Sequence, residues 1–315
     1  MLNFARLSLL LFFTALLICS PANAESRRQI QITYLGNAGW QITNGKTIIL
    51  VDPFISEFRP AKKREQLSAD DPIATPWAAG IDEHIRKADY ILITHGHEDH
   101  MLDAPYISNR TGATIICSES AANIARAYGI GNIDRNAPDL QAIKDQKLIV
   151  VRGGEDYQFD DFSLEVIPSL HTALFDKRYN DGFWADSTPP DLTAPLHESA
   201  YAEGGTFIYL LRMDGHKIFI MGSMNYIERN ITGLRPDIAI IGAGSSRNEI
   251  YHYAATLMHA LGNPPIVLPT HWDDFGTKPR SDALKSVHIF GDEIRAASPH
   301  TKVIVPDYFV PMSFK

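Results

Sequence analysis

Residues 94–100 read Thr-His-Gly-His-Glu-Asp-His, and they directly follow residues 88–93 (ADYILI), which we predict to form a buried strand. Three histidines and one aspartate therefore stand within six residues at the end of a strand. Imidazole nitrogens and carboxylate oxygens are ligands that suit Zn²⁺, and Gly96 allows the backbone to turn closely. A chance cluster of polar surface residues is the alternative, but a strand that delivers such a motif is the context that a metal site requires.

Predicted strands and helices alternate on both sides of this motif. Two dipeptides, Asn44-Gly45 and Asp214-Gly215, are typical of two-residue hairpins. The other predicted strands are 29–35, 38–43, 47–51, 113–117, 147–151, 162–167, 206–212, 216–221, 237–241, 265–269 and 302–306. The predicted helices are 82–88, 103–109, 119–128, 248–260 and 281–296. Hairpins with interspersed helices favour an α/β or α+β sandwich, with two sheets inside and helices outside.

The motif at 94–100 resembles the H-x-H-x-D-H signature of the metallo-β-lactamase superfamily. Residues 34–39 (YLGNAG) and 52–54 (DPF), together with 94–97 (THGH), resemble its lactonase-like and phospholipase D-like branch. The resemblance covers nearly the whole chain after residue 24. It implies an αββα four-layer sandwich of α/β (α+β) class, the metallo-β-lactamase fold, with the site at one edge of the sheets.

The resemblance also implies a ligand set. His171 follows predicted strand 162–167 and matches the family's third histidine on the first metal; His271 follows strand 265–269 and matches the last histidine, on the second metal. The implied ligands are His95, His97 and His171 for one ion and Asp99, His100 and His271 for the other. We expect zinc, one or two ions per chain, whose bound water would have a pKa near ~7. Asp99 is the candidate to orient that water and take its proton.

Two positions depart from the family pattern. Many members of the branch read L-G-H-A where this chain has Asn37, and the family usually places a metal-bridging aspartate where this chain has Ser223. A serine hydroxyl is a poor zinc ligand beside histidine and carboxylate, so we expect the second site to be weaker than the first. Ser223 is a candidate catalytic residue that could hydrogen-bond water or substrate, and a small residue tolerated after a turn is the alternative.

Candidate substrate contacts come mainly from residues 174–205, a long segment with little periodicity. Its aromatic residues favour a lid over the metals, and a surface excursion packed on the outer helices is the alternative. The candidate contacts are Phe175, Tyr179, Trp184 and, outside the segment, Tyr226.

These features predict a metal-dependent hydrolase. The leading hypothesis is that a metal-bound hydroxide hydrolyses a small ester, lactone, amide or lactam. A phosphodiesterase acting on a phosphodiester or phospholipid is the second hypothesis, which the phospholipase D-like resemblance implies. A degenerate, non-catalytic metal-binding protein is the third; Asn37 and Ser223 suggest it, and the intact ligand set argues against it.

Residues 1–24 read as a secretory signal peptide. Arg6 gives the positive start, residues 7–18 form a short apolar run, and residues 22–24 (ANA) form a cleavage site. An uncleaved anchor is one alternative, and a lipoprotein modified at Cys19 is another. We expect one hydrolase domain over residues 25–315, exported to the periplasm or secreted.

Composition excludes several other classes of protein. The chain has 315 residues, of which 45% are hydrophobic and 21% charged, so it is not disordered. It carries 29 basic and 37 acidic residues without a long basic run, so we expect no nucleic-acid partner; a small-molecule substrate is the expectation from the predicted hydrolase. No apolar run of about 18 residues follows the leader, so we expect no membrane span in the mature protein. Only two cysteines, Cys19 and Cys117, are present, so metal binding must rest on histidine and carboxylate. The oligomeric state stays open.

Overall fold

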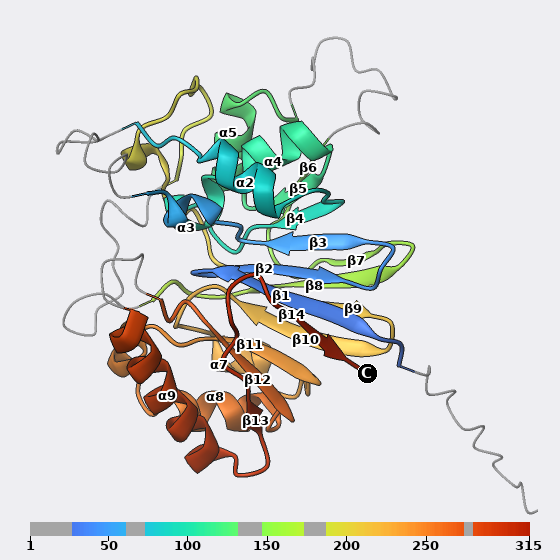
Figure 1. Ribbon diagram of the computed structural model, residues 1–315, viewed down its shortest axis with the longest axis vertical. Coiled ribbons are helices and arrows are strands. Elements are labelled where there is room, and N and C mark those ends of the chain that lie inside the picture. The colour runs from blue at the N-terminus through green and yellow to red at the C-terminus, as the bar shows by residue number, and fades with distance from the viewer. Residues whose placement is uncertain (1–26, 61–72, 132–146, 173–186, 274–279) are drawn as a thin grey trace, which may run out of the picture.

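The computed structural model describes residues 27–60, 73–131, 147–172, 187–273 and 280–315. Two seven-stranded sheets lie face to face and helices cover both outer faces, so the chain forms the expected αββα sandwich (Figure 1). The predicted signal peptide, residues 1–24, lies outside the described residues. Within them, no helix combines the length and the apolar character that a membrane crossing needs.

The first sheet is built from N-terminal strands and one strand from the end of the chain. Its order is β14-β1-β2-β3-β4-β5-β6, antiparallel from β14 to β3 and parallel from β3 to β6. The strands are β1 (Ile30–Gly36), β2 (Gly39–Thr43), β3 (Ile48–Val51), β4 (Tyr90–Leu92), β5 (Thr114–Cys117), β6 (Leu148–Val150) and β14 (Pro311–Phe314). The helices beside its outer face are η1 (Ile55–Phe58), α2 (Ala78–His84), α3 (Glu98–Met101), α4 (Ala104–Thr111) and α5 (Glu119–Ala127).

The second sheet holds the rest of the strands, in the order β13-β12-β11-β10-β9-β8-β7. It is antiparallel from β7 to β10 and parallel from β10 to β13. The strands are β7 (Asp156–Gln158), β8 (Phe162–Pro168), β9 (Phe207–Met213), β10 (His216–Met221), β11 (Ile238–Gly242), β12 (Ile266–Thr270) and β13 (Lys302–Val303). The helices α7 (Glu228–Ile231), α8 (Tyr253–Leu261) and α9 (Arg280–Ala297) lie on its outer side (Figure 1), and η2 (Glu198–Ala200) and η3 (Ser245–Glu249) lie in connections.

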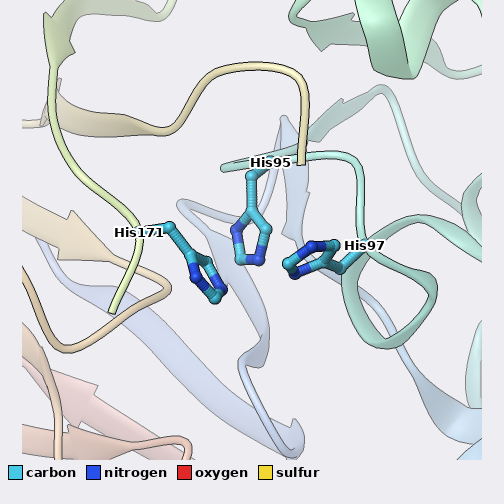
Figure 2. A group of neighbouring side chains, drawn as sticks. All are labelled: His95, His97 and His171. Carbon is cyan, nitrogen blue, oxygen red and sulfur yellow. The ribbon is translucent and has the colours of Figure 1, made fainter. Parts of the chain in front are cut away.

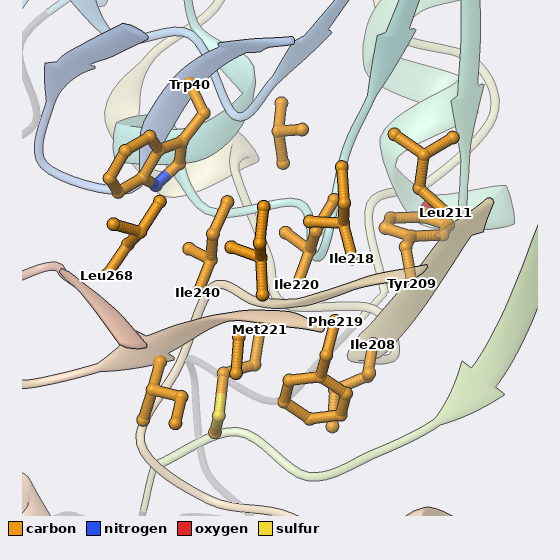
Figure 3. Close-up of a cluster of buried hydrophobic side chains, with 14 of the residues drawn as sticks. Trp40, Ile208, Tyr209, Leu211, Ile218, Phe219, Ile220, Met221, Ile240 and Leu268 are labelled. Carbon is orange, nitrogen blue, oxygen red and sulfur yellow. The ribbon is translucent and has the colours of Figure 1, made fainter. Parts of the chain in front are cut away.

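The second sheet is buried on both faces. Along β10, Ile218 and Ile220 point toward the first sheet, where Trp40 lies, while Phe219 and Met221 point toward the helices (Figure 3). All five side chains are at most 1% exposed. A strand covered on both sides reads as a nearly continuous apolar run, which is why residues 216–221 show little alternation.

Strand direction decides where the site forms. The pairing pattern makes β1, β3 and β4 run the same way in the first sheet, and β8, β10 and β12 run the same way in the second. The carboxyl ends of these strands meet at one edge of the sandwich. The residues that follow them are Asn37 after β1, Asp52 after β3, His95 after β4, His171 after β8, Ser223 after β10 and His271 after β12.

The predicted elements are largely present, with a few differences. The helix expected at 82–88 is α2, which ends at His84 because Ile85 is extended on the way into β4. The helix expected at 248–260 begins only at Tyr253, because His252 adopts a left-handed backbone with φ 45° and interrupts it. The predicted strand 302–306 is reduced to β13, and the short strands β7 and β14 were not predicted.

A buried carboxyl group joins η1 to the start of α4. Asp103 is fully buried; its Oδ2 accepts the Ser56 N–H at 2.9 Å and its Oδ1 lies 2.5 Å from Ser56 Oγ. Burial raises the pKa of Asp103 to about 6, although the bonds from Ser56 act in the opposite direction. The folded protein therefore binds this proton more tightly than the unfolded chain does.

We predict that this carboxyl makes the fold less stable as the pH rises. Its stabilising contribution is complete below the unfolded pKa near 4 and is lost as the pH rises through about 6, which amounts to roughly 3 kcal/mol by about pH 7. Asp103→Asn imitates the protonated acid and should remove this pH dependence. Urea unfolding across this pH range measures it, with the exposed Asp292→Asn on α9 as control. An unchanged slope in Asp103→Asn would contradict the assignment.

Candidate metal centre

Three histidines converge from the two sheets at the shared edge. His95 and His97 come from the loop after β4, and His171 comes from the segment after β8. Their rings point toward one another (Figure 2), and the ring centroids of the three pairs lie 4.8, 4.8 and 4.6 Å apart. One nitrogen of each lies within 4.8 Å of the others. The structure thus brings together the three residues predicted for the first site.

A second group adjoins the first. Asp99 Oδ2 lies 3.0 Å from His100 Nε2 and 3.2 Å from His271 Nε2. Asp99 and His100 belong to α3, whereas His271 follows β12. The ring centroids of His95 and His100 are only 3.8 Å apart. The residues predicted for the second site are therefore also together, next to the first group.

The loop that carries the first two histidines is packed against another backbone segment. Gly96 N–H donates to the Glu203 carbonyl at 2.9 Å, and a Cβ atom on Gly96 would collide with the Ala202 carbonyl oxygen. Glycine is needed here because the two backbones approach so closely.

Asp52 contacts Nδ1 of His100, the ring nitrogen that does not face Asp99. The Asp52 carboxylate is fully buried at the end of β3, and its Oδ2 lies 2.9 Å from His100 Nδ1. It also accepts the Thr94 N–H at 2.8 Å and the Thr94 hydroxyl at 2.6 Å. A carboxylate on Nδ1 keeps the proton on that nitrogen and leaves Nε2 available to a metal.

Three of the strand-end residues have a left-handed backbone. Asn37, Asp52 and His271 have φ values of 49°, 39° and 53°. Such a conformation costs about 1–3 kcal/mol in a residue other than glycine and persists only where neighbours enforce it. One enforcing contact is the hydrogen bond from His271 N–H to the Asn37 carbonyl at 2.7 Å.

The two groups have opposite electrostatic character. Burial and the neighbouring imidazoles lower the pKa of His95 well below its ordinary value and that of His171 to about 3. These rings are neutral at neutral pH, which is the form that binds metal. Burial also lowers the pKa of His100, but Asp99 and Asp52 outweigh it and raise the pKa to about 10. Without a metal the ring therefore carries a proton on each nitrogen at neutral pH; a metal ion at Nε2 would displace that proton, while Asp52 retains the one on Nδ1.

The donor atoms fit a metal ion. His95 Nε2 is buried and has no hydrogen-bond partner among the described residues. Leaving such an atom unpartnered costs about 1–3 kcal/mol, which coordination would remove. A three-histidine group and an Asp-His-His group are both donor sets that suit Zn²⁺ and leave a position open for water.

The family described as the β-lactamase superfamily domain matches residues 31–271, a range that contains all six candidate ligands. The chain belongs to this superfamily. A UPF0173 metal-dependent hydrolase of Methanosphaera stadtmanae is 28% identical over 253 residues, 78% of this chain and 85% of the relative. One of Thermoplasma volcanium is 26% identical over 284 residues, 90% of this chain and 98% of the relative.

Solved structures confirm the fold of the superfamily. The metallo hydrolase Igni18 of Ignicoccus hospitalis covers 91% of this chain and 99% of its own, with a TM-score of 0.55 at 18% identity. The metallo-β-lactamase fold protein YhfI of Bacillus subtilis covers 91% and 100%, with a TM-score of 0.50 at 13% identity.

Ser223 stands where the superfamily resemblance led us to look for a bridging aspartate. Its side chain is buried, and its hydroxyl oxygen accepts the Thr172 N–H at 2.9 Å. Asn225 Nδ2 donates to the His171 carbonyl at 3.2 Å. The segment after β10 thus holds the backbone around His171. Ser223 accepts this bond and keeps its O–H to donate, so its predicted role as a hydrogen-bond partner of water or substrate stays a prediction.

The predicted substrate contacts are placed less well. Phe175, Tyr179 and Trp184 lie outside the described residues. Tyr226 is buried in the core, and its hydroxyl lies 2.5 Å from Thr256 Oγ1, so a substrate would have to displace that contact to use it.

The described part of the predicted lid, residues 187–205, packs against the helices of the first sheet. The Thr188 N–H donates to Ser120 Oγ at 2.7 Å, and the Ala74 N–H donates to the Leu196 carbonyl at 2.9 Å. For residues 187–196 these contacts favour the alternative, a surface excursion packed on the outer helices. Residues 202–203 instead lie against Gly96, in the loop that carries the first two histidines.

Sequence reasoning assigned no role to Asp52 and no contact to Asn37. A signal was available for Asp52, because an acidic residue directly follows a predicted strand. Its contact with His100 depends on the parallel pairing of β3 with β4. The order of the strands in the sheet cannot be deduced from the sequence pattern alone.

We predict that Asp52→Asn weakens metal binding at the second group. The new NH₂ would donate to His100 Nδ1, which moves the ring proton to Nε2, the nitrogen that faces Asp99. Zinc titration of the metal-free protein should show a loss of about 10–100-fold in affinity for that ion. Asp237→Asn is the matched control, because Asp237 accepts the Lys217 N–H at 2.9 Å at the opposite edge. Unchanged affinity in Asp52→Asn would show that Asp52 does not set the tautomer.

Proposed function

We propose that this metal-dependent hydrolase uses one or two zinc ions to hydrolyse a small ester, lactone, amide or lactam. The observation that carries the proposal is the convergence of two ligand groups, three histidines and Asp-His-His, at one edge of the sandwich. The donor chemistry supports zinc, since each group offers three nitrogen or oxygen atoms and no sulfur.

Bound zinc would supply a hydroxide at neutral pH, because it lowers the pKa of its water to about 7. His95, His97 and His171 would hold the first ion, and Asp99, His100 and His271 the second. Asp99 is 18% exposed, whereas the His100 side chain is 1% exposed. The carboxylate can therefore reach a bound substrate, orient the attacking oxygen and accept its proton.

Ionisation of Asp99 is secured by its neighbours. Burial raises the pKa of this carboxyl, but His100 and His271 outweigh it and hold the pKa well below its ordinary value. An ionised carboxylate is available both as a ligand and as a proton acceptor at neutral pH.

We expect purified protein to contain one or two zinc ions per chain, and a chelator should abolish turnover that added zinc restores. Asp99→Ala should lower kcat/KM by about 10²–10⁴-fold with the fold intact, while the exposed Asp292→Ala should not change it. Nitrocefin, a homoserine lactone and bis-p-nitrophenyl phosphate are assayed side by side.

The outcomes separate the hypotheses. Protein that binds no metal would contradict the centre. Turnover of the phosphodiester without the lactam or lactone would favour the phosphodiesterase hypothesis instead. Bound metal with no turnover on a wide panel would favour a non-catalytic metal-binding protein.

Export is part of the proposal and rests on residues 1–24 alone. In cells that express the full chain, we expect to find the protein in the periplasm or the medium. Its intact mass should equal that of residues 25–315, which begin with Glu25. Cytoplasmic protein that retains Met1 would contradict export without touching the hydrolase assignment.

A further inference from the structure

Asn37 lies between the two sheets and contacts the second group of ligands through its side chain. It follows β1 and is fully buried. Its Nδ2 donates to the Asp99 backbone carbonyl at 3.0 Å and to Asp99 Oδ2 at 3.1 Å. Both contacts are acceptors, so the NH₂ end of the amide must face Asp99.

The backbone of the same residue contacts the second group from the other sheet. The Asn37 carbonyl accepts the His271 N–H at 2.7 Å and the Tyr34 hydroxyl at 2.6 Å. The Asn37 N–H donates to Asp273 Oδ2 at 3.1 Å, and Asp273 Oδ1 lies 2.5 Å from the Tyr34 hydroxyl. Asn37 is thus fixed by Tyr34 and Asp273, and it holds one ligand from each sheet.

We propose that Asn37 is a positioning residue that sets the affinity of the second metal ion through Asp99 and His271. This inference rests on the proposed metal-dependent function. Its amide fixes the carboxylate of Asp99, and its carbonyl fixes the backbone of His271. The hydrogen bonds of Asn37 join it to the Asp-His-His group, and Asn37 therefore acts on one ion more than on the other.

The chemistry of an amide suits this task. An amide does not titrate, so Asn37 keeps its N–H donors whatever the pH, whereas an imidazole in its place could lose its donor with a change of tautomer. Asn37 Oδ1 is buried and has no hydrogen-bond partner among the described residues.

The left-handed backbone of Asn37 allows the side chain to be tested separately. With φ 49°, Asn37→Gly removes the amide and keeps a residue that adopts this backbone without strain. The carbonyl that accepts the His271 N–H therefore stays in place. Asn263, two residues after the end of α8, is exposed and has φ 57°. Asn263→Gly therefore makes the same substitution in the same backbone conformation and is the matched control.

The test is calorimetric titration of the metal-free full chain with zinc. His171→Ala and His271→Ala assign the two binding steps to the two groups. We expect Asn37→Gly to weaken the step that needs His271 by about 10–100-fold and to leave the step that needs His171 within about threefold. Asn263→Gly should change neither step. Should Asn37→Gly fail to fold, Asn37→Ser replaces it, since the serine side chain is too short to reach Asp99 Oδ2.

Three results would overturn the inference: equal weakening of both steps, no weakening, or a wild-type protein that takes up one ion only. A wild-type protein that binds no zinc would instead refute the proposed function. The two failures are therefore distinguishable in one titration series.

Discussion

Two sheets that bury apolar faces against each other impose the constraint on which the metal centre depends. The strands that carry the candidate ligands run in the same direction within each sheet, and the sheets are packed so that the carboxyl ends of both sets lie at one edge, as the contact of His271 with Asn37 shows. Side chains such as Ile218 and Trp40 fill the space between the sheets and fix their separation. Because the six candidate ligands lie only a few residues beyond the ends of these strands, the packing of the two sheets also fixes the positions of the ligands.

The two ligand groups differ in the charge of their buried side chains. His95 and His171 are buried imidazoles whose low pKa values keep them neutral, and this group needs no compensating charge. The second group alternates charges, with Asp52 against His100 and His100 against Asp99. Buried charges persist only when they are paired and hydrogen-bonded, and Thr94 and Asn37 supply the remaining bonds. Both Thr94 and Asn37 donate without carrying a charge, so they satisfy the carboxylates without adding to the buried charge.

Much of this could be predicted from sequence, for identifiable reasons. The H-x-H-x-D-H motif is local, and the positions of His171 and His271 directly after apolar strands are local as well. Hairpin dipeptides located β2–β3 and β9–β10 without knowledge of the fold. The contacts of Asp52 and Asn37 were not accessible, because they depend on which strands are neighbours. The start of α8 was wrong because the left-handed backbone of His252 has no strong signature in a residue other than glycine.

The edge strand β14 joins the last part of the chain to the first. It pairs with β1, with Ile30 opposite Phe314, so the sheet that carries His95 is completed only by residues near position 314. His271 likewise comes long after His95 in the order of synthesis. When only the first half of the chain has been synthesised, the first sheet therefore lacks its edge strand β14 and the second ligand group lacks His271. Contacts this distant in sequence are typical of proteins that fold slowly, and the metal centre depends on contacts of this kind across most of the chain.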